Sequence, residues 1–212
     1  MINLKQLYRE IQASRSPENL GDFAILKADA LGARMHSSVA TKMESVVGYY
    51  PAIDMEALGQ FPEGSFGREY ARHMQENRLT PFNVSPELDD VAQRNVFALR
   101  YAVTHDIFHV LLGFDTSYAG EIGVLAFAAA QNYSPALKLS LKAARVLYPL
   151  LAPRQRQAIA ANLKLGAALG QQAKFLLGYR FEDHWSHPLT DIKAELGLPC
   201  EVSPGKGQAL RA

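Results

Sequence analysis

Four side chains able to bind a metal lie within one short segment of the sequence. His105 and Asp106 are adjacent, His109 lies four residues after His105, and Glu121 follows after eleven intervening residues. Neutral imidazole and carboxylate groups together suit zinc, iron or manganese, and the carboxylates alone would also bind magnesium. The segment therefore predicts a divalent-metal site, and the residues by themselves leave the identity of the metal open.

The first three of these residues fit one face of an α-helix. Each helical residue advances the chain by about 100°, so His105 and His109, four residues apart, lie roughly 40° from each other. Apolar side chains surround the motif, namely Tyr101, Ile107, Phe108, Leu111 and Leu112. Because unpaired ionisable groups are costly to bury among such residues, a bound cation would relieve that cost.

Two consecutive helices are expected to position the four groups. A serine, proline and glutamate at residues 85–87 form a helix start signal, and the helical pattern continues to residue 112, where Gly113 ends it. One of the polar residues 115–117 can cap the next helix, which places Glu121 in about its first turn. The sequence thus predicts a helix-loop-helix that closes on a metal.

The remaining periodicity is also helical. Further helices are expected over residues 2–11, from Ser16 to about residue 31, over 135–148 and over 153–177, where Gly166 and Gly170 would permit close helix packing. The best strand candidate, VVGYY at residues 46–50, is short. We therefore expect an all-α, single-domain bundle of roughly seven to nine helices, with the domain over residues 1–200 and a flexible tail over 201–212.

The segment from Phe61 to Met74 has two interpretations. It combines a Pro/Gly turn with a helix on which Phe66, Tyr70 and Met74 share one face, which is typical of a packed amphipathic helix. The alternative is that the helix N-terminus and three nearby side chains hold an anionic head group, these being Arg68, Arg72 and His73.

Composition excludes several classes of protein. The 212 residues include 22 basic and 21 acidic side chains with no dense cluster of lysine or arginine, so nucleic acid is not expected as a partner. A single cysteine, Cys200, excludes an internal disulfide framework. The N-terminal residues predict neither a secretory signal nor a mitochondrial presequence, and no apolar run approaches the roughly 20 residues that span a bilayer.

The histidines and acidic residues also allow other sites and reactions, which the sequence supports less well. In a variant zincin site, Asp106 would be the general base beside zinc held by His105, His109 and Glu121, but aspartate is shorter than the usual glutamate. An HD-type phosphohydrolase would need an upstream histidine and a downstream aspartate that the sequence does not identify. A second metal site at His184, Trp185 and His187 lacks supporting ligands, as Cys200 is distant.

The sequence resembles the Coq4 family, the fourth of the coenzyme Q (ubiquinone) biosynthesis proteins, in its bacterial form. The family hallmark is HDxxH followed by a glutamate after eleven residues, and further similarity covers residues 61–74, Arg100 and Tyr101, Gly120 and a closing block from Glu182 to Gly197. The chain departs from the family at residues 124–129, where VLAFAA replaces a block containing Lys-Trp-Phe-Glu, and at Phe66, where leucine is usual.

The resemblance implies a metal site at His105, Asp106, His109 and Glu121, and decarboxylation, with accompanying oxidation, at C1 of a polyprenylated 4-hydroxybenzoate. The protein would then be a metal-dependent lyase in which Asp106 and Glu121 are catalytic. Iron held by both histidines and one carboxylate would approximate a facial triad, whereas zinc would argue for simple decarboxylation. Substrate contacts are expected from Arg68, Tyr70, Arg72 and Tyr101.

The resemblance also implies partners and a location. The expected partners are a prenyl lipid or polyprenylated aromatic acid, other quinone-biosynthesis enzymes and a membrane surface, and homodimer formation is left open. A bacterial member would lie in the cytoplasm against the inner membrane. Its eukaryotic relatives would lie against the mitochondrial inner membrane, on the matrix side. The alternative function is a non-catalytic scaffold that binds prenyl lipid and organises the biosynthetic complex.

Overall fold

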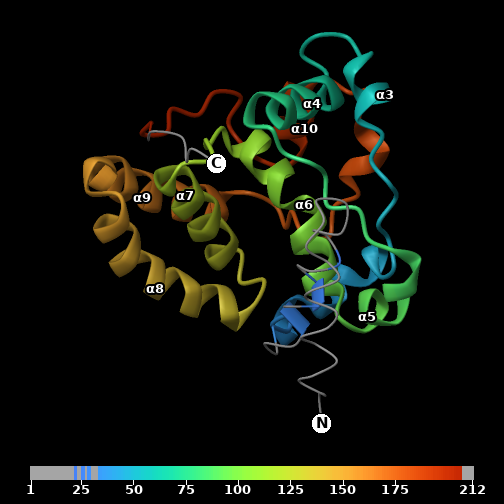
Figure 1. Cartoon of the computed structure of the whole chain (residues 1–212), viewed down its shortest axis with the longest axis horizontal. Helices are drawn as coiled ribbons and strands as arrows, with labels where there is room; N and C mark the ends of the chain where they lie inside the picture. Colours follow the sequence, from blue (N-terminus) through green and yellow to red (C-terminus); the bar gives the residue numbers. More distant parts are fainter. Residues whose placement is uncertain (1–21, 23–24, 27, 30–32, 207–212) are drawn as a thin grey trace.

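The computed structural model describes residues 22, 25–26, 28–29 and 33–206, and helices form its regular structure (Figure 1). Its α-helices are α3 (Met55–Gly59), α4 (Phe66–Asn77), α5 (Asp89–Arg94), α6 (Val96–Leu112), α7 (Tyr118–Ala130), α8 (Pro135–Leu151), α9 (Arg156–Gln172) and α10 (Leu189–Glu195). Four 3-10 helices join them: η2 (Ser37–Val46), η3 (Pro86–Leu88), η4 (Pro153–Gln155) and η5 (Phe181–His184). The predicted all-α single-domain fold is confirmed, and the VVGYY segment forms no strand.

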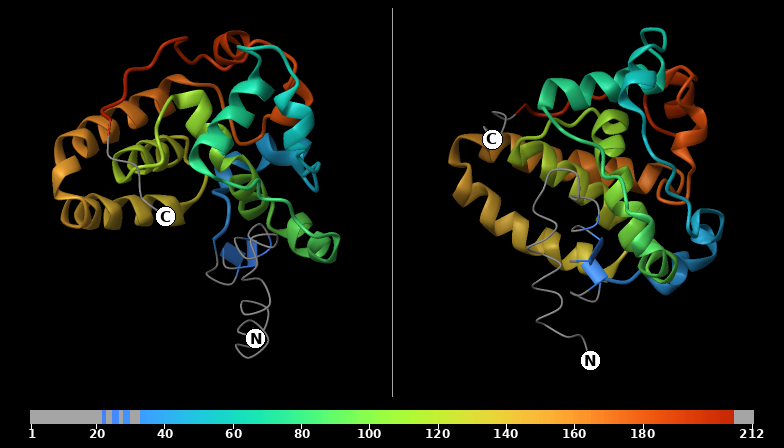
Figure 2. Two further views of the ribbon diagram at one scale, coloured as in Figure 1. Left: turned by 45° about the horizontal axis from the view of Figure 1, so that its top comes forward. Right: turned by 45° about the vertical axis from the view of Figure 1, so that its right-hand side comes forward.

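Helix α6 runs through the middle of the molecule and divides the other helices into two groups. On one side α7 lies between α8 and α9, and on the other α4 packs against α3 and α10 (Figures 1 and 2). Helix α8 lies at the outer edge of its group and turns through η4 into α9. No helix within the described residues is both long enough and apolar enough to cross a bilayer.

The main core forms around the buried face of α6. Phe108 is fully buried, and its ring lies 6.0 Å from Phe127 of α7, 6.1 Å from Tyr133 and 6.2 Å from Phe181 of η5, measured between centroids. One aromatic side chain of α6 thus contacts three segments that are distant in the sequence. The burial of these rings stabilises the packing of α6 against those segments.

Helix α4 has the amphipathic face expected from the sequence. Phe66, Tyr70 and Met74 are all buried, and Ser65 caps the helix by accepting a hydrogen bond from the amide of Arg68. Trp185 stacks on Phe66 with 4.7 Å between ring centroids. The prediction of a packed amphipathic helix is therefore confirmed.

The prediction of one long helix over residues 86–112 is wrong in one respect, because the helix breaks at Asn95. There the backbone leaves the helical region, with φ −120° and ψ 64°, and the Asn95 side chain accepts a hydrogen bond from the amide of Ala98. Its amide group donates to Asp29 and to the carbonyl of Ala33. An asparagine that hydrogen-bonds to nearby and distant backbone competes with the helix, so α6 begins afresh at residue 96.

The other predicted boundaries differ less. Gly113, with φ 70°, ends α6 as expected, and Ser117 caps α7. The segment 153–177 forms η4 and then α9, which ends at Gln172. The first predicted helix, over residues 2–11, lies outside the described residues, and the described part of the second is helical.

Glycines allow α7 and α9 to pack backbone against backbone. A Cβ atom at Gly166 would lie 2.1 Å from the carbonyl oxygen of Gly123, and one at Gly170 would lie 2.6 Å from that of Phe127. The expectation that these glycines permit close helix packing is confirmed. Since Glu121 lies two residues before Gly123 on α7, this contact also constrains where the carboxylate is held.

Residues 201–206 run along the surface of α9. The buried side chain of Asn162 exchanges two hydrogen bonds with Gly205, at 2.7 and 2.8 Å, and donates to the carbonyl of Ala119 at 2.9 Å. One side chain thus joins α7, α9 and this segment. Residues 207–212 lie outside the described part of the chain, and the predicted domain bounds stay a prediction.

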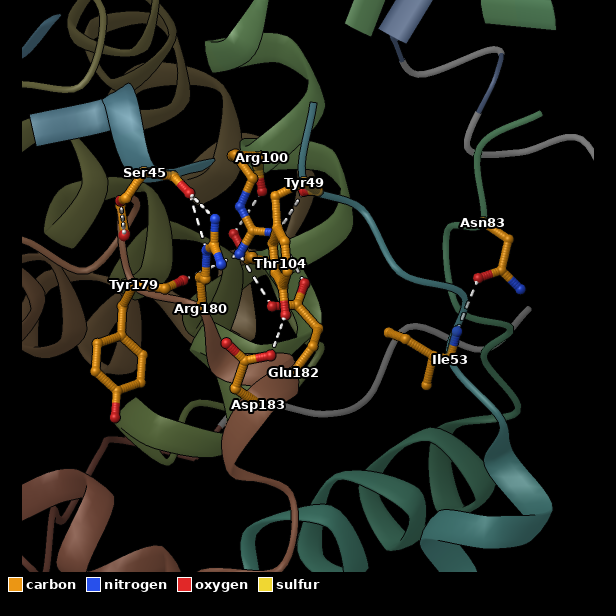
Figure 3. A network of polar contacts seen from close by, with 11 residues as sticks. Ser45, Tyr49, Ile53, Asn83, Arg100, Thr104, Tyr179, Arg180, Glu182 and Asp183 are labelled. Carbon is orange, nitrogen blue, oxygen red and sulfur yellow. Dashed lines mark hydrogen bonds and ion pairs between the residues drawn. The ribbon is translucent and has the colours of Figure 1, made fainter. Parts of the chain in front are cut away.

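A buried arginine joins α6 to two distant segments (Figure 3). Arg100 is fully buried and forms a two-pronged ion pair with Glu182 of η5, at 2.8 and 3.2 Å. Its guanidinium also donates to the carbonyl oxygens of Tyr49 and Tyr179, at 3.1 and 3.0 Å. Because Arg100 lies five residues before His105, these bonds determine the position of the helix that carries both motif histidines.

Replacing Arg100 with methionine is expected to lower the free energy of unfolding by roughly 3–5 kcal/mol, because Glu182 would remain buried without its partner. Urea denaturation followed by circular dichroism measures the change. Arg72→Ala is the matched control, since Arg72 is exposed and pairs with Glu69 and Glu76, and it should cost at most about 1 kcal/mol. Equal losses in the two variants would contradict a special role for the buried pair.

The Gly166→Ala variant is expected to lose about 1–3 kcal/mol of stability, because the added methyl group would overlap the backbone of α7. An alanine in a helix ordinarily stabilises it, so the sign of the change is informative. Gly59→Ala is the control, since its nearest non-neighbouring atom would lie 3.8 Å away, and thermal unfolding compares the two. A Gly166 variant as stable as the control would show that α7 and α9 separate without cost.

Candidate metal centre

Three of the four motif residues converge where α6 and α7 meet. His105 and His109 lie on α6 and Glu121 lies in the first turn of α7, and each offers one ligand atom within 4.8 Å of the others. The Glu121 carboxylate faces both histidines, at 3.3 Å from Nε2 of His109 and 3.6 Å from Nε2 of His105. Two consecutive helices and their five-residue connection therefore bring the three ligand atoms together.

The Phe114 carbonyl orients His109. The Nδ1–H of His109 donates to this carbonyl oxygen at 3.1 Å, so Nε2 faces Glu121 and is the nitrogen that would bind a cation in place of a proton. Burial lowers the pKa of His109, but the Glu121 carboxylate outweighs this effect and raises it. This Nε2 is buried and forms no hydrogen bond of ordinary geometry, although it faces Glu121. A buried nitrogen without a partner, beside a second imidazole and a carboxylate, fits a divalent cation and suits zinc or iron.

Asp106 lies outside this group of three. Its carboxylate is 3.6 Å from Nδ1 of His105, on the side of the ring opposite the nitrogen that faces Glu121. A carboxylate behind a histidine ligand orients the ring and makes it a stronger donor. The geometry thus favours Asp106 as a neighbour that orients His105, rather than as one of the three converging ligands.

Both carboxyl groups are ionised at neutral pH. Burial raises the pKa of Glu121, but His109 and His105 outweigh this effect, so the pKa lies below its usual value. Burial likewise raises the pKa of Asp106, and the neighbouring histidines His105, His109 and His73 bring it below its usual value. The centre therefore presents two negative charges to a cation.

Helix α4 contributes a third histidine beside the group. The His73 ring stacks against His109, with 5.8 Å between centroids and 18° between planes. Thr116 donates to Oδ1 of Asn77, so the amide nitrogen of Asn77 faces Nδ1 of His73 at 3.5 Å. This contact leaves the hydrogen on Nε2 of His73, which is buried and has no partner.

The predicted substrate-binding residues lie in different places. Tyr101 meets the His105 ring edge-on, 5.8 Å between centroids, and burial together with the Glu121 charge raises its pKa. Tyr70 is buried beside Trp185, and burial followed by the Asp106 charge raises its pKa. Both tyrosines therefore border the centre from the apolar side.

The two arginines lie further from the three ligands. Arg68 donates to the carbonyl of Gly59 and lines a hollow of about 620 Å³ between α3 and α4. Arg72 pairs with Glu69 at the edge of that hollow and also borders a second one of about 390 Å³, which His73 and His109 line. Only Arg72 thus reaches a cavity shared with a motif residue, and the substrate contacts stay predictions.

Sequence reasoning missed several groups that complete the site. The Phe114 carbonyl, the Thr116–Asn77 contact and Tyr148 of α8, on which the Glu121 charge acts, all approach from outside the motif. Asn77 follows His73 by one helical turn, which is the only local signal that joins them. The His184 and His187 rings meet edge-on with 5.1 Å between centroids, and His184 stacks on Tyr179, so neither belongs to the group of three ligands.

Comparisons with known proteins agree with the motif. The sequence model of a family described as "Coenzyme Q (ubiquinone) biosynthesis protein Coq4" matches residues 49–201. The mitochondrial ubiquinone biosynthesis protein COQ4 homolog of Xenopus laevis is 31% identical over 148 residues, covering 69% of this chain and 51% of that protein. Its Homo sapiens counterpart is 32% identical over 157 residues, covering 69% and 55%. The chain spans about half the length of these curated relatives.

A solved structure shares the fold. The crystal structure of a Nostoc punctiforme protein named for ubiquinone biosynthesis superposes with a TM-score of 0.65. The match covers 92% of this chain and 95% of that protein, at 24% sequence identity. At this identity the likeness supports the arrangement of helices and nothing finer.

If the centre binds a divalent metal, His109→Ala should weaken binding of Zn²⁺ or Co²⁺ by at least about 100-fold, because it removes a buried ligand. Asp106→Asn should weaken it by roughly 10–100-fold, as expected for a residue that orients a ligand. Titration calorimetry and the visible absorption of bound Co²⁺ measure these changes. His184→Ala is the control and should bind like the parent protein. A larger loss of metal affinity in Asp106→Asn than in His109→Ala would contradict the assignment of His109 as a ligand and Asp106 as the residue that orients one.

Proposed function

Because the chain belongs to the Coq4 family of coenzyme Q (ubiquinone) biosynthesis proteins, we propose that it removes the C1 carboxyl group of a polyprenylated 4-hydroxybenzoate in a metal-dependent reaction. The observation that carries this proposal is the convergence of His105, His109 and Glu121, with the unpaired Nε2 of His109 facing the carboxylate. Such a group can hold a cation that leaves positions open for an anionic substrate.

The reaction breaks the bond between ring carbon C1 and the carboxyl carbon, and the carboxyl group leaves as carbon dioxide. In simple decarboxylation a proton takes the electron pair left on C1. In the oxidative form, dioxygen supplies a hydroxyl oxygen to C1, and an external donor of two electrons reduces the second oxygen atom to water.

The chain's own residues would bind and orient the substrate. His105, His109 and Glu121 would hold the metal, which when bound supplies positive charge for the carboxylate and, if it is iron, redox chemistry with dioxygen. Asp106 would orient His105, and its ionised carboxylate would accept a proton beside the ring. Tyr101 borders His105 from the apolar side, where it would contact the substrate ring.

The metal decides between the two forms of the reaction. Two histidines and one carboxylate are the ligand set of iron(II) oxygenases, which keep open positions for substrate and dioxygen. The same three residues also suit zinc, which cannot change oxidation state and would allow only the simple form. We propose the oxidative form with iron.

We further propose that the protein works next to a membrane with other quinone-biosynthesis enzymes, against the inner membrane in a bacterium. Its substrate would carry a polyprenyl tail and so reside in lipid. This location is consistent with the family's role in ubiquinone biosynthesis, which passes one lipid-tailed intermediate through several enzymes.

The test is to incubate the purified protein, loaded separately with Fe²⁺, Zn²⁺ and Mn²⁺, with a short-chain prenyl 4-hydroxybenzoate in air, with ascorbate as the two-electron donor. We expect release of carbon dioxide with iron, and His109→Ala should lower the rate by at least about 100-fold with the fold retained. Mass spectrometry identifies the product as the phenol or the hydroquinone.

The same experiment separates an enzyme from a scaffold. Absence of turnover with every metal, together with binding of the prenyl compound, would overturn the catalytic proposal and favour a lipid-binding scaffold. His184→Ala is the matched control, because His184 contacts Tyr179 and His187 and does not belong to the metal centre.

A further inference from the structure

Helix α8 carries apolar side chains on two faces, one directed inward and one outward. Its inward face packs through Leu137, Ala144 and Tyr148 against α7 and its flanks. The large side chains on the opposite side are exposed, with relative exposures of 70% for Leu139, 64% for Val146, 51% for Leu147 and 64% for Leu150, and Leu151 at the end of the helix is 61% exposed. These five account for most of the exposed large apolar residues in the described part of the chain.

The exposed residues form a stripe along the helix. At about 100° per residue, Leu139, Val146 and Leu150 lie within roughly 40° of one another, and Leu147 lies beside them. We call this stripe the outer face of α8, defined by Leu139, Val146, Leu147 and Leu150. Contiguous apolar side chains on a helix surface mark a site of contact with another apolar phase or protein.

Positive charge borders the outer face. Lys138, Lys142 and Arg145 are exposed along one flank of the stripe. Residues 122–181 contain no aspartate or glutamate, and their eight basic side chains are all exposed: Lys138, Lys142, Arg145, Arg154, Arg156, Lys164, Lys174 and Arg180. A chain that is nearly neutral as a whole thus carries an excess of exposed basic side chains on α8, η4 and α9.

We infer that the outer face of α8 docks on the surface of an anionic lipid bilayer. The leucines and valine would enter the interfacial layer, and the lysines and arginines beside them would lie at the level of the acidic head groups. This inference rests on the membrane association proposed above and assigns it to one helix.

Charge complementarity favours lipid over a second copy of the chain. A two-fold contact through this face would pair the surface with itself. Neither copy would bring an acidic residue from the 122–181 region, so the cations would face like charge or remain unpaired. An anionic bilayer supplies both the apolar layer and the opposite charge.

The two faces of α8 connect the docking surface to the candidate metal centre. Tyr148, on the inward face, lies 5.1 Å from Tyr118 between ring centroids, and the Glu121 charge contributes to raising its pKa after burial. Tyr148 adjoins Leu147 of the outer face in the sequence. A docked α8 would therefore place the centre directly behind the helix that touches lipid.

The inference is tested by flotation of the full chain with vesicles of phosphatidylcholine alone and with 30% phosphatidylglycerol. Phosphatidylglycerol, at about one lipid in three, gives these vesicles a negatively charged surface. We expect binding to the anionic vesicles, weakened by salt. Leu139→Gln combined with Leu147→Gln and Leu150→Gln should weaken binding by at least about tenfold, and Lys138→Gln with Lys142→Gln and Arg145→Gln should remove the preference for anionic lipid.

The control is Val47→Gln with Leu79→Gln, which changes the exposed large apolar residues outside α8 and should bind like the parent protein. Circular dichroism and Co²⁺ binding check that each variant folds. If the parent binds no vesicles, membrane association itself fails. If it binds and the leucine variant binds equally well, this docking surface is wrong while the association stands. Conversion of a dimer to a monomer by the leucine variant, with vesicle binding unchanged, would assign the face to a second copy.

Discussion

The buried ion pair between Arg100 and Glu182 constrains the rest of the structure. It joins α6 to η5 across 82 residues, and the two added carbonyl bonds tie the same guanidinium to the segments around Tyr49 and Tyr179. A fully buried charge with several good partners tolerates little displacement, since any movement leaves it unpaired. The direction and rotation of α6, and with them the two motif histidines, follow from this one arginine.

The candidate centre depends on a second constraint, the close approach of α7 to its neighbours. Gly166 and Gly170 let α9 touch the backbone of α7, which brings the first turn of α7 and its Glu121 back over α6. Ser117 and the Phe114 carbonyl complete the connection, one by capping α7 and the other by orienting His109. Negative charge and an unpaired imidazole nitrogen are thereby gathered where a cation would neutralise both.

Function and surface are related through α8. Its inward face packs through Tyr148 against Tyr118 at the start of α7, and its outer face leaves leucines exposed beside lysine and arginine. The chain has almost no net charge, yet none of its acidic residues lies between residues 122 and 181. This separation of charge gives the molecule one face suited to anionic lipid, and the proposed chemistry of a lipid-tailed acid would take place behind it.

Local patterns in the sequence determined much of this protein. The HDxxH spacing, the stop at Gly113 and the placement of Glu121 in a first turn depend on neighbours within a few residues, so the motif geometry and the all-α fold were predictable. Only the tertiary structure decided the break at Asn95, the Arg100–Glu182 pair and the position of His73 beside His109. It also decided which apolar face of α8 is buried. These features depend on contacts between segments far apart in the sequence, and helical periodicity shows that a face is apolar without showing what covers it.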